Sequence, residues 1–176
     1  MIVRRKHIKS VVDRLLKVFA ISQPPVDIDA IAASMAIEVR RAPGPEALSG
    51  YFMREPSTGR AIIGINTTHS LVRQRFTLAH ELGHFLLHDL KNVHVDGVVK
   101  LRGPKSSEGT DCEEIEANEF AAQILIPENL IIRDLSESQM PSLFEDDALA
   151  PMLVELADKY KVSRAALGYR IINLKS

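Results

Sequence analysis

Residues 80–84 have the sequence His-Glu-Leu-Gly-His, which places two histidines four positions apart with a glutamate beside the first. On a helix, His80 and His84 would lie on one face about 5–6 Å apart, so both imidazoles could bind one Zn²⁺ ion. Glu81 is then suited to act as general base on a water molecule that the metal activates. The pattern predicts metal-assisted hydrolysis. The alternative interpretation is a buried histidine pair that only satisfies its own hydrogen bonds.

Two histidines need a third ligand, and the residues after His84 exclude the metzincin solution. That class has Gly and His at the positions that Leu87 and Leu90 occupy here. The other common solution is a carboxylate on a second helix, and the helical segment 112–126 supplies one. Its candidates are Glu113, Glu114 and Glu116.

Helical periodicity separates these three glutamates. Glu114 shares an inward stripe with residues at i+4, i+7 and i+11, namely Asn118, Ala121 and Leu125. We therefore predict that Glu114 is the third ligand and that Asn118 orients a ligand from behind. Glu113 and Glu116 are expected to face solvent.

Three further features have weaker chemical interpretations. His88, one turn beyond His84, is either an additional ligand, a residue behind the ligands or a helix cap. Tyr51 is either an oxyanion donor or an ordinary core or surface tyrosine. The segment RAIIGIN (60–66) is a candidate edge strand that could hold an extended substrate through main-chain hydrogen bonds, with Ile63 and Ile65 as test positions.

The spacing of apolar residues and the turn residues along the rest of the chain predict the helices and strands that position these side chains. Apolar spacing predicts a helix over about 5–21, and Asp27 is a suitable N-cap for a short second helix. Alternating residues and the turn signal at 56–59 predict a three-stranded antiparallel-type sheet within about 36–66. The helix that carries the histidines follows, capped by Thr67 or Thr68. Further helices are expected over 112–126, from about 128, over 149–160 and over 163–174, with a break near Pro141.

This order indicates an α+β fold, with the small sheet packed on a helical bundle. We expect a metallopeptidase domain over 1–135 and a C-terminal helical extension over 136–176. The extension has the rhythm of a helix-turn-helix, with Arg164, Arg170 and Lys175 nearby, so a DNA-binding regulator is the main rival function.

Composition limits the function classes. The 176 residues carry 22 Lys+Arg against 23 Asp+Glu, a net charge of -1, which argues against strong direct DNA binding. A docking surface for a partner protein is the favoured use of the C-terminal helices. The single Cys112 gives no disulfide framework, and the sequence shows neither a signal-peptide core nor an apolar run of 18 residues. We therefore expect a cytoplasmic protein that does not bind membranes.

Two segments together resemble the ImmA/IrrE metallopeptidases. One is TLAHELGH (77–84), preceded by RQRF, and the other is EIEANEFAA (114–122), followed by LIP at 125–127. The resemblance implies a gluzincin-like site with His80, His84 and Glu114 as ligands and Glu81 as general base. It also implies an intracellular endopeptidase that cleaves a partner helix-turn-helix repressor and thereby derepresses mobile-element, phage or stress-response genes.

One other function stays open at this point. The chain could be a DNA-binding or protein-binding regulator whose metal site is not catalytic. Structural zinc sites usually have four protein ligands and favour Cys, whereas three ligands and an adjacent Glu81 favour catalysis. Zn²⁺ suits two histidines and a carboxylate, and Mn²⁺ could also occupy such a site.

Overall fold

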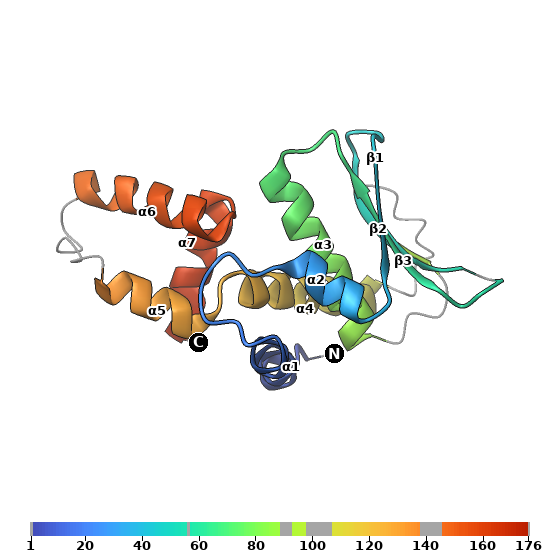
Figure 1. Ribbon diagram of the computed structural model, residues 1–176, viewed down its shortest axis with the longest axis horizontal. Coiled ribbons are helices and arrows are strands. Elements are labelled where there is room, and N and C mark those ends of the chain that lie inside the picture. Colours follow the sequence, from blue (N-terminus) through green and yellow to red (C-terminus); the bar gives the residue numbers. More distant parts are fainter. Residues whose placement is uncertain (1, 56, 89–92, 98–106, 138–145, 176) are drawn as a thin grey trace.

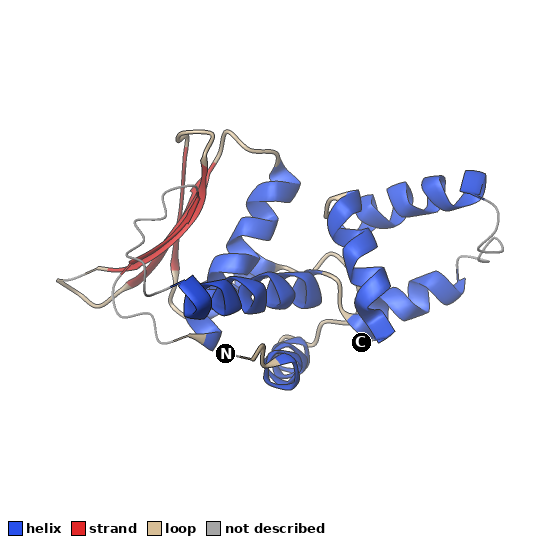
Figure 2. Cartoon of the chain, turned by 180° about the vertical axis from the view of Figure 1, so that it is seen from behind, coloured by secondary structure: helices blue, strands red, loops and turns tan. Residues whose placement is uncertain are grey.

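The computed structural model describes residues 2–55, 57–88, 93–97, 107–137 and 146–175. A mixed sheet lies at one end of the molecule, the C-terminal helices lie at the other, and the remaining helices lie between them (Figures 1 and 2). The helices are α1 (Arg5–Val18), α2 (Ile28–Ser34), α3 (Leu71–Leu87), α4 (Ser107–Leu125), α5 (Glu128–Glu137), α6 (Asp146–Tyr160) and α7 (Arg164–Ile172). The strands are β1 (Glu38–Ala42), β2 (Leu48–Arg54), β3 (Ala61–Asn66) and β4 (Val93–Gly97). The prediction of an α+β fold is confirmed.

The sheet differs from the prediction in its order and direction. The four described strands have the order β1-β3-β2-β4, with β1 parallel to β3 and the other two pairs antiparallel. The predicted hairpin is present as β2 and β3. The expectation of a three-stranded antiparallel-type sheet is wrong, because β3 lies between β1 and β2, runs parallel to β1, and β4 adds a fourth strand beside β2.

The prediction that segment 60–66 forms an edge strand is also wrong. Ile63 pairs with Val39 of β1 on one side and with Phe52 of β2 on the other, so β3 is central. Ile63 and Ile65 are 0% and 3% exposed. A strand that is covered on both faces has a continuous apolar sequence, as AIIGIN does, and its main-chain groups already bond to two neighbours. These two isoleucines therefore cannot receive a substrate strand.

The N-cap of α2 is the residue that the sequence predicted, whereas the N-cap of α3 is not. The Asp27 side chain accepts a hydrogen bond from the Ala30 N–H at 2.9 Å, as predicted for the start of α2. Helix α3 has Ser70 as its N-cap, not Thr67 or Thr68. Thr68 instead donates its N–H and hydroxyl to Asn66 Oδ1, at 3.0 and 2.8 Å, which places it in the turn that follows β3.

One cluster of buried apolar side chains extends from the sheet through α3 and α4 to the C-terminal helices. Polar contacts add to this packing. The Tyr160 hydroxyl on α6 donates to Asp134 Oδ2 on α5 at 2.9 Å, and Arg170 Nε on α7 donates to the Ile126 carbonyl after α4 at 3.2 Å. The boundary expected after residue 135 stays a prediction, and the break expected near Pro141 lies outside the described residues. Among the helices that the structure describes, none is long and apolar enough to cross a membrane.

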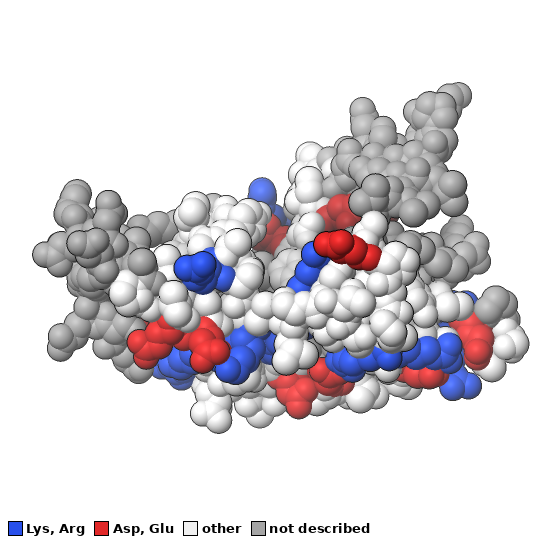
Figure 3. Space-filling model, turned by 90° about the horizontal axis from the view of Figure 1, so that it is seen from above, with Lys and Arg blue, Asp and Glu red and all other residues white. Residues whose placement is uncertain are grey.

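The charged side chains of the described surface are mixed in sign. On the face shown in Figure 3, basic and acidic side chains lie next to one another along one band. Several form ion pairs between elements, such as Lys9 of α1 with Glu128 of α5 at 2.8 Å. Exposed pairs of this kind contribute about 0–1 kcal/mol each to stability. Their main consequence is that positive charge is neutralised locally.

Candidate metal centre

Helix α3 carries the two histidines and the glutamate of the HExxH pattern inside the molecule. His80, Glu81 and His84 are 3%, 0% and 0% exposed. The spacing of four residues places both imidazoles on the same side of the helix, and their Nε2 atoms are 3.0 Å apart. The prediction that this segment is helical is confirmed, and His88 is the C-cap of the same helix.

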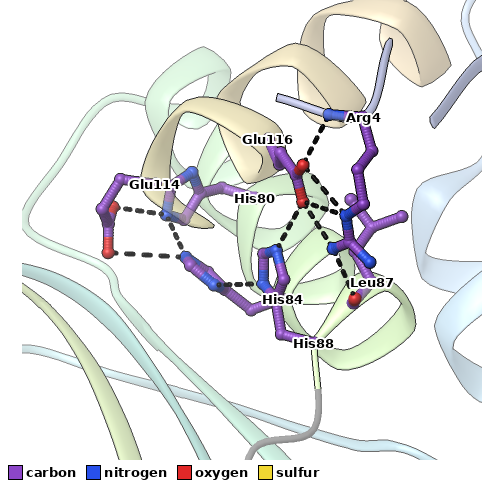
Figure 4. Close-up of polar contacts among 7 residues, drawn as sticks. All are labelled: Arg4, His80, His84, Leu87, His88, Glu114 and Glu116. Atoms are coloured by element: carbon purple, nitrogen blue, oxygen red, sulfur yellow. Dashed lines mark hydrogen bonds and ion pairs between the residues drawn. The ribbon is translucent and has the colours of Figure 1, made fainter. Parts of the chain in front are cut away.

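Helix α4 passes close to α3 and presents a carboxylate to this pair. The close approach depends on Gly83, where an added Cβ would lie 3.0 Å from Phe120 Cδ1 and 3.2 Å from Ala117 Cα of α4. Glu114 lies one turn before Ala117. Its carboxylate oxygens are 3.4 Å from His80 Nε2 and 3.6 Å from His84 Nε2 (Figure 4).

These three side chains fit one metal ion. Their ligand atoms all lie within 4.8 Å of one another. A tetrahedral ion at about 2.0–2.2 Å from nitrogen and oxygen ligands holds those ligands about 3.3–3.6 Å apart, close to the three separations observed. The stripe predicted from the sequence thus brings Glu114 to the two histidines. Two imidazoles and one carboxylate suit Zn²⁺ by ligand type and leave a fourth position for water or substrate.

Each imidazole has a partner at its other nitrogen. His80 Nδ1 lies 3.1 Å from Asn118 Oδ1, so Asn118 is placed where the sequence predicted it, behind a ligand. His84 Nδ1 lies 3.1 Å from His88 Nδ1. His88 therefore contacts a candidate ligand, His84, from behind, and it does not belong to the group of three that could hold an ion.

Glu116 corrects one expectation from the sequence. It was expected to face solvent, but it is 3% exposed and accepts hydrogen bonds from Arg4 at both carboxylate oxygens. Its Oε2 also lies 3.1 Å from His88 Nε2. The hydrogen bonds from Arg4, with a smaller contribution from His88, lower the pKa of Glu116 to about 2. The charge is thus compensated, which explains why a carboxylate is tolerated on the buried side of α4.

The structure does not bring Tyr51 to the metal centre. Along β2, side chains alternate between the two faces of the sheet. Phe52 faces α3, where its ring contacts Phe85 with ring centroids 5.7 Å apart. The Tyr51 ring lies on the opposite face, over Gly64 of β3, where an added Cβ would be 2.1 Å from a ring carbon. This position favours a packing role over the oxyanion role considered from the sequence.

An apolar cavity of about 320 Å³ lies next to the candidate metal ligands. Asn118, which contacts His80, forms part of its wall, and so does Ile115, the residue after Glu114. The rest of the wall comes from Phe76, Ala122, Ala166 and Tyr169. The sequence did not indicate this cavity, because it forms where α7 meets α3 and α4.

Comparison with known proteins adds one finding. A peptidase family model described as the IrrE N-terminal-like domain matches residues 32–171. The matched range begins within α2 and ends within α7, so it contains every residue of the candidate metal centre and leaves α1 outside. No curated protein was found to match the chain.

Proposed function

The chain belongs to this peptidase family of IrrE N-terminal-like domains, and we propose that it is a zinc-dependent endopeptidase that cleaves a partner helix-turn-helix repressor. The observation that carries the proposal is the convergence of His80, His84 and Glu114 on one point, with Glu81 on the same helix. Cleavage of the repressor would derepress mobile-element, phage or stress-response genes. A DNA-bound repressor shares the compartment of the chromosome, so the proposed location is the cytoplasm.

The side chains divide the chemistry among them. His80, His84 and Glu114 would hold the ion, which when bound supplies Lewis-acid activation of water and of the scissile carbonyl. Glu81 accepts the proton of the attacking water and later gives it to the leaving amine. Zn²⁺ is the proposed metal, and Mn²⁺ is the alternative that the same ligand set allows.

The number of ligands favours a catalytic site over a structural one. Structural zinc sites usually close the coordination sphere with four protein ligands. Here three side chains form the group within the part of the chain that the structure describes. A fourth position left for water is the arrangement that hydrolysis requires.

The apolar cavity beside Asn118 supports a peptide as substrate. Ligand-binding cavities combine an apolar wall with a few polar groups that fix orientation. In this cavity Asn118, which contacts His80, supplies a polar amide to the wall, and the apolar part of the wall includes Phe76, Ile115 and Tyr169. We propose that an apolar side chain of the substrate enters it next to the cleaved bond.

The C-terminal helices favour protein docking over DNA readout. Arg170, one of the basic residues that suggested DNA binding, is 6% exposed and is used inside the molecule on the Ile126 carbonyl. In contrast, Val154 on α6 and Tyr169 and Ile172 on α7 are 49%, 54% and 79% exposed. Exposed apolar side chains of this size suit a protein partner, so α6 and α7 are the proposed docking site for the repressor.

The test is cleavage of a candidate helix-turn-helix repressor by the purified zinc-loaded protein, with the Glu81→Gln variant as the matched control. We expect a discrete cut by the wild-type protein, loss of that cut after metal removal, and no cut by Glu81→Gln. Cleavage that persists in Glu81→Gln would refute the assignment of the base. Specific binding of the purified chain to operator DNA, without cleavage of the repressor, would favour the regulator alternative.

A further inference from the structure

A continuous set of hydrogen bonds connects the N-terminal segment to one candidate metal ligand. Arg4, directly before α1, donates from its backbone N–H to Glu116 Oε1 at 2.7 Å and from its guanidinium to Glu116 Oε2 at 2.6 Å. Glu116 Oε2 lies 3.1 Å from His88 Nε2, and His88 Nδ1 lies 3.1 Å from His84 Nδ1 (Figure 4). Arg4 also donates to the Leu87 carbonyl at 2.9 Å, which holds the end of α3.

When His84 binds a metal through Nε2, only one arrangement of protons satisfies this set of contacts. His84 Nδ1 then carries the proton and donates it to His88 Nδ1, which must be the acceptor. The proton of neutral His88 is therefore on Nε2, where it donates to the Glu116 carboxylate. Arg4 supplies the donors that keep this carboxylate in place. A metal bound at His84 Nε2 therefore sets the proton position on both His84 and His88.

We propose that Arg4, Glu116 and His88 are positioning residues that fix the ring orientation and the tautomer of His84, so that the N-terminal segment completes the metal site. This inference rests on the proposed function, because it takes His84 as a metal ligand. Arg4 lies outside residues 32–171, the range that the family model matches. In this chain the metal site thus depends on a residue that the matched range does not contain.

A neighbouring ion pair also attaches the N-terminal segment to α4, and it serves as a comparison for the pair Arg4–Glu116. Arg5 Nε of α1 lies 3.8 Å from Glu119 Oε2 of α4, on side chains that are 63% and 13% exposed. This pair and the pair Arg4–Glu116 both connect the start of the α1 region to α4, and the Arg4 and Glu116 side chains are 49% and 4% exposed. Glu116, by contrast, also contacts His88. The pair Arg5–Glu119 is therefore a matched control for attachment without positioning.

The first measurement is zinc affinity, by competition with a chromogenic chelator, for the full chain. We expect Arg4→Ala and Glu116→Gln to bind zinc about 10–100-fold more weakly than wild type, the usual effect of removing a group behind a ligand. In Glu116→Gln an amide nitrogen must face an Arg4 donor, because Arg4 donates to both oxygens. Arg5→Ala and Glu119→Gln should bind zinc as wild type does.

A second measurement tests the proposed proton positions directly in the wild-type protein, so it does not depend on how well the variants fold. Nitrogen-15 NMR of the zinc-loaded wild-type protein should show His88 neutral, with its proton on Nε2, and the His84 proton on Nδ1. A His88 proton on Nδ1, or equal zinc affinities for both pairs of variants, would overturn the inference while the proposed function stands. A wild-type chain that binds no zinc would overturn both.

Discussion

The substitution Gly83→Ala tests how closely α3 and α4 must pack for the site to form. An added Cβ would lie 3.0 Å from Phe120 Cδ1, 3.2 Å from Ala117 Cα and 3.3 Å from the Ala117 oxygen. Two of these neighbours are backbone atoms of α4, so a change of rotamer cannot relieve the contact. The matched control is Gly168→Ala in α7, because an added Cβ there meets no atom within 4 Å.

The expected free energies of unfolding follow from two effects. Replacing Gly by Ala within a helix stabilises it by about 1 kcal/mol, so Gly168→Ala should gain about that amount. Overpacking costs about 1–3 kcal/mol, which leaves Gly83→Ala with a net loss of about 0–2 kcal/mol. The two variants should therefore differ by about 1–3 kcal/mol in urea denaturation of the metal-free protein. Gly83→Ala should also bind zinc more weakly, because the displaced helix carries Glu114.

Equal gains in stability for the two variants would refute this reasoning, because they would show that α3 and α4 are not in close contact at Gly83. Unchanged zinc affinity in a destabilised Gly83→Ala protein would be a different result. It would mean that α4 relaxes without moving Glu114.

Three other perturbations have defined outcomes. Tyr160→Phe should lower the free energy of unfolding by about 1–2 kcal/mol, since it removes a buried hydrogen bond to Asp134. Burial and this hydrogen bond raise the pKa of Tyr160, so its contribution is present below about pH 10, where unfolded tyrosine ionises, and is lost as pH rises further. Denaturation at pH 7 and above pH 10 checks both statements, and an unchanged gap between the two proteins would contradict the second. Ala166→Phe narrows the apolar cavity, so it should impair repressor cleavage. Its zinc content, measured by mass spectrometry, should stay at the wild-type value. Undiminished cleavage would show that the substrate does not use the cavity. Metal removal with a chelator should lower the melting temperature, because zinc at 1,000 times its dissociation constant adds about 4 kcal/mol to the free energy of unfolding. A melting temperature that responds neither to chelator nor to added zinc would contradict a specific metal site.

The parts of the site that lie within one helix were predictable from the sequence. The spacing of His80 and His84 fixes their common face once the segment is helical, and the stripe through Glu114 and Asn118 selects the side of α4 that meets them. Both inferences need only the helical period. The fold class followed from the order of the elements in the same way.

The contacts between distant segments were not predictable. Glu116 shares a stripe with Phe120 and Ile124, both fully buried, and this spacing was the available signal that it faces inward. Its partner Arg4 lies 112 positions away, so nothing local indicates how the buried charge is compensated. The order of the strands was not predictable for the same reason. Whether β3 lies at the edge of the sheet or between β1 and β2 depends on pairing between strands that are distant in the sequence.

In the proposed function, His80, His84 and Glu114 hold one metal ion and Glu81 serves as the base for the water that it activates. Metal content per chain, measured by mass spectrometry on the purified wild-type, His84→Ala, Glu114→Ala and Glu81→Gln proteins, tests it most directly. We expect about one zinc per chain in the wild-type and Glu81→Gln proteins and a loss of zinc in the other two. Full zinc content in Glu114→Ala, or no metal in the wild-type protein after reconstitution, would contradict it.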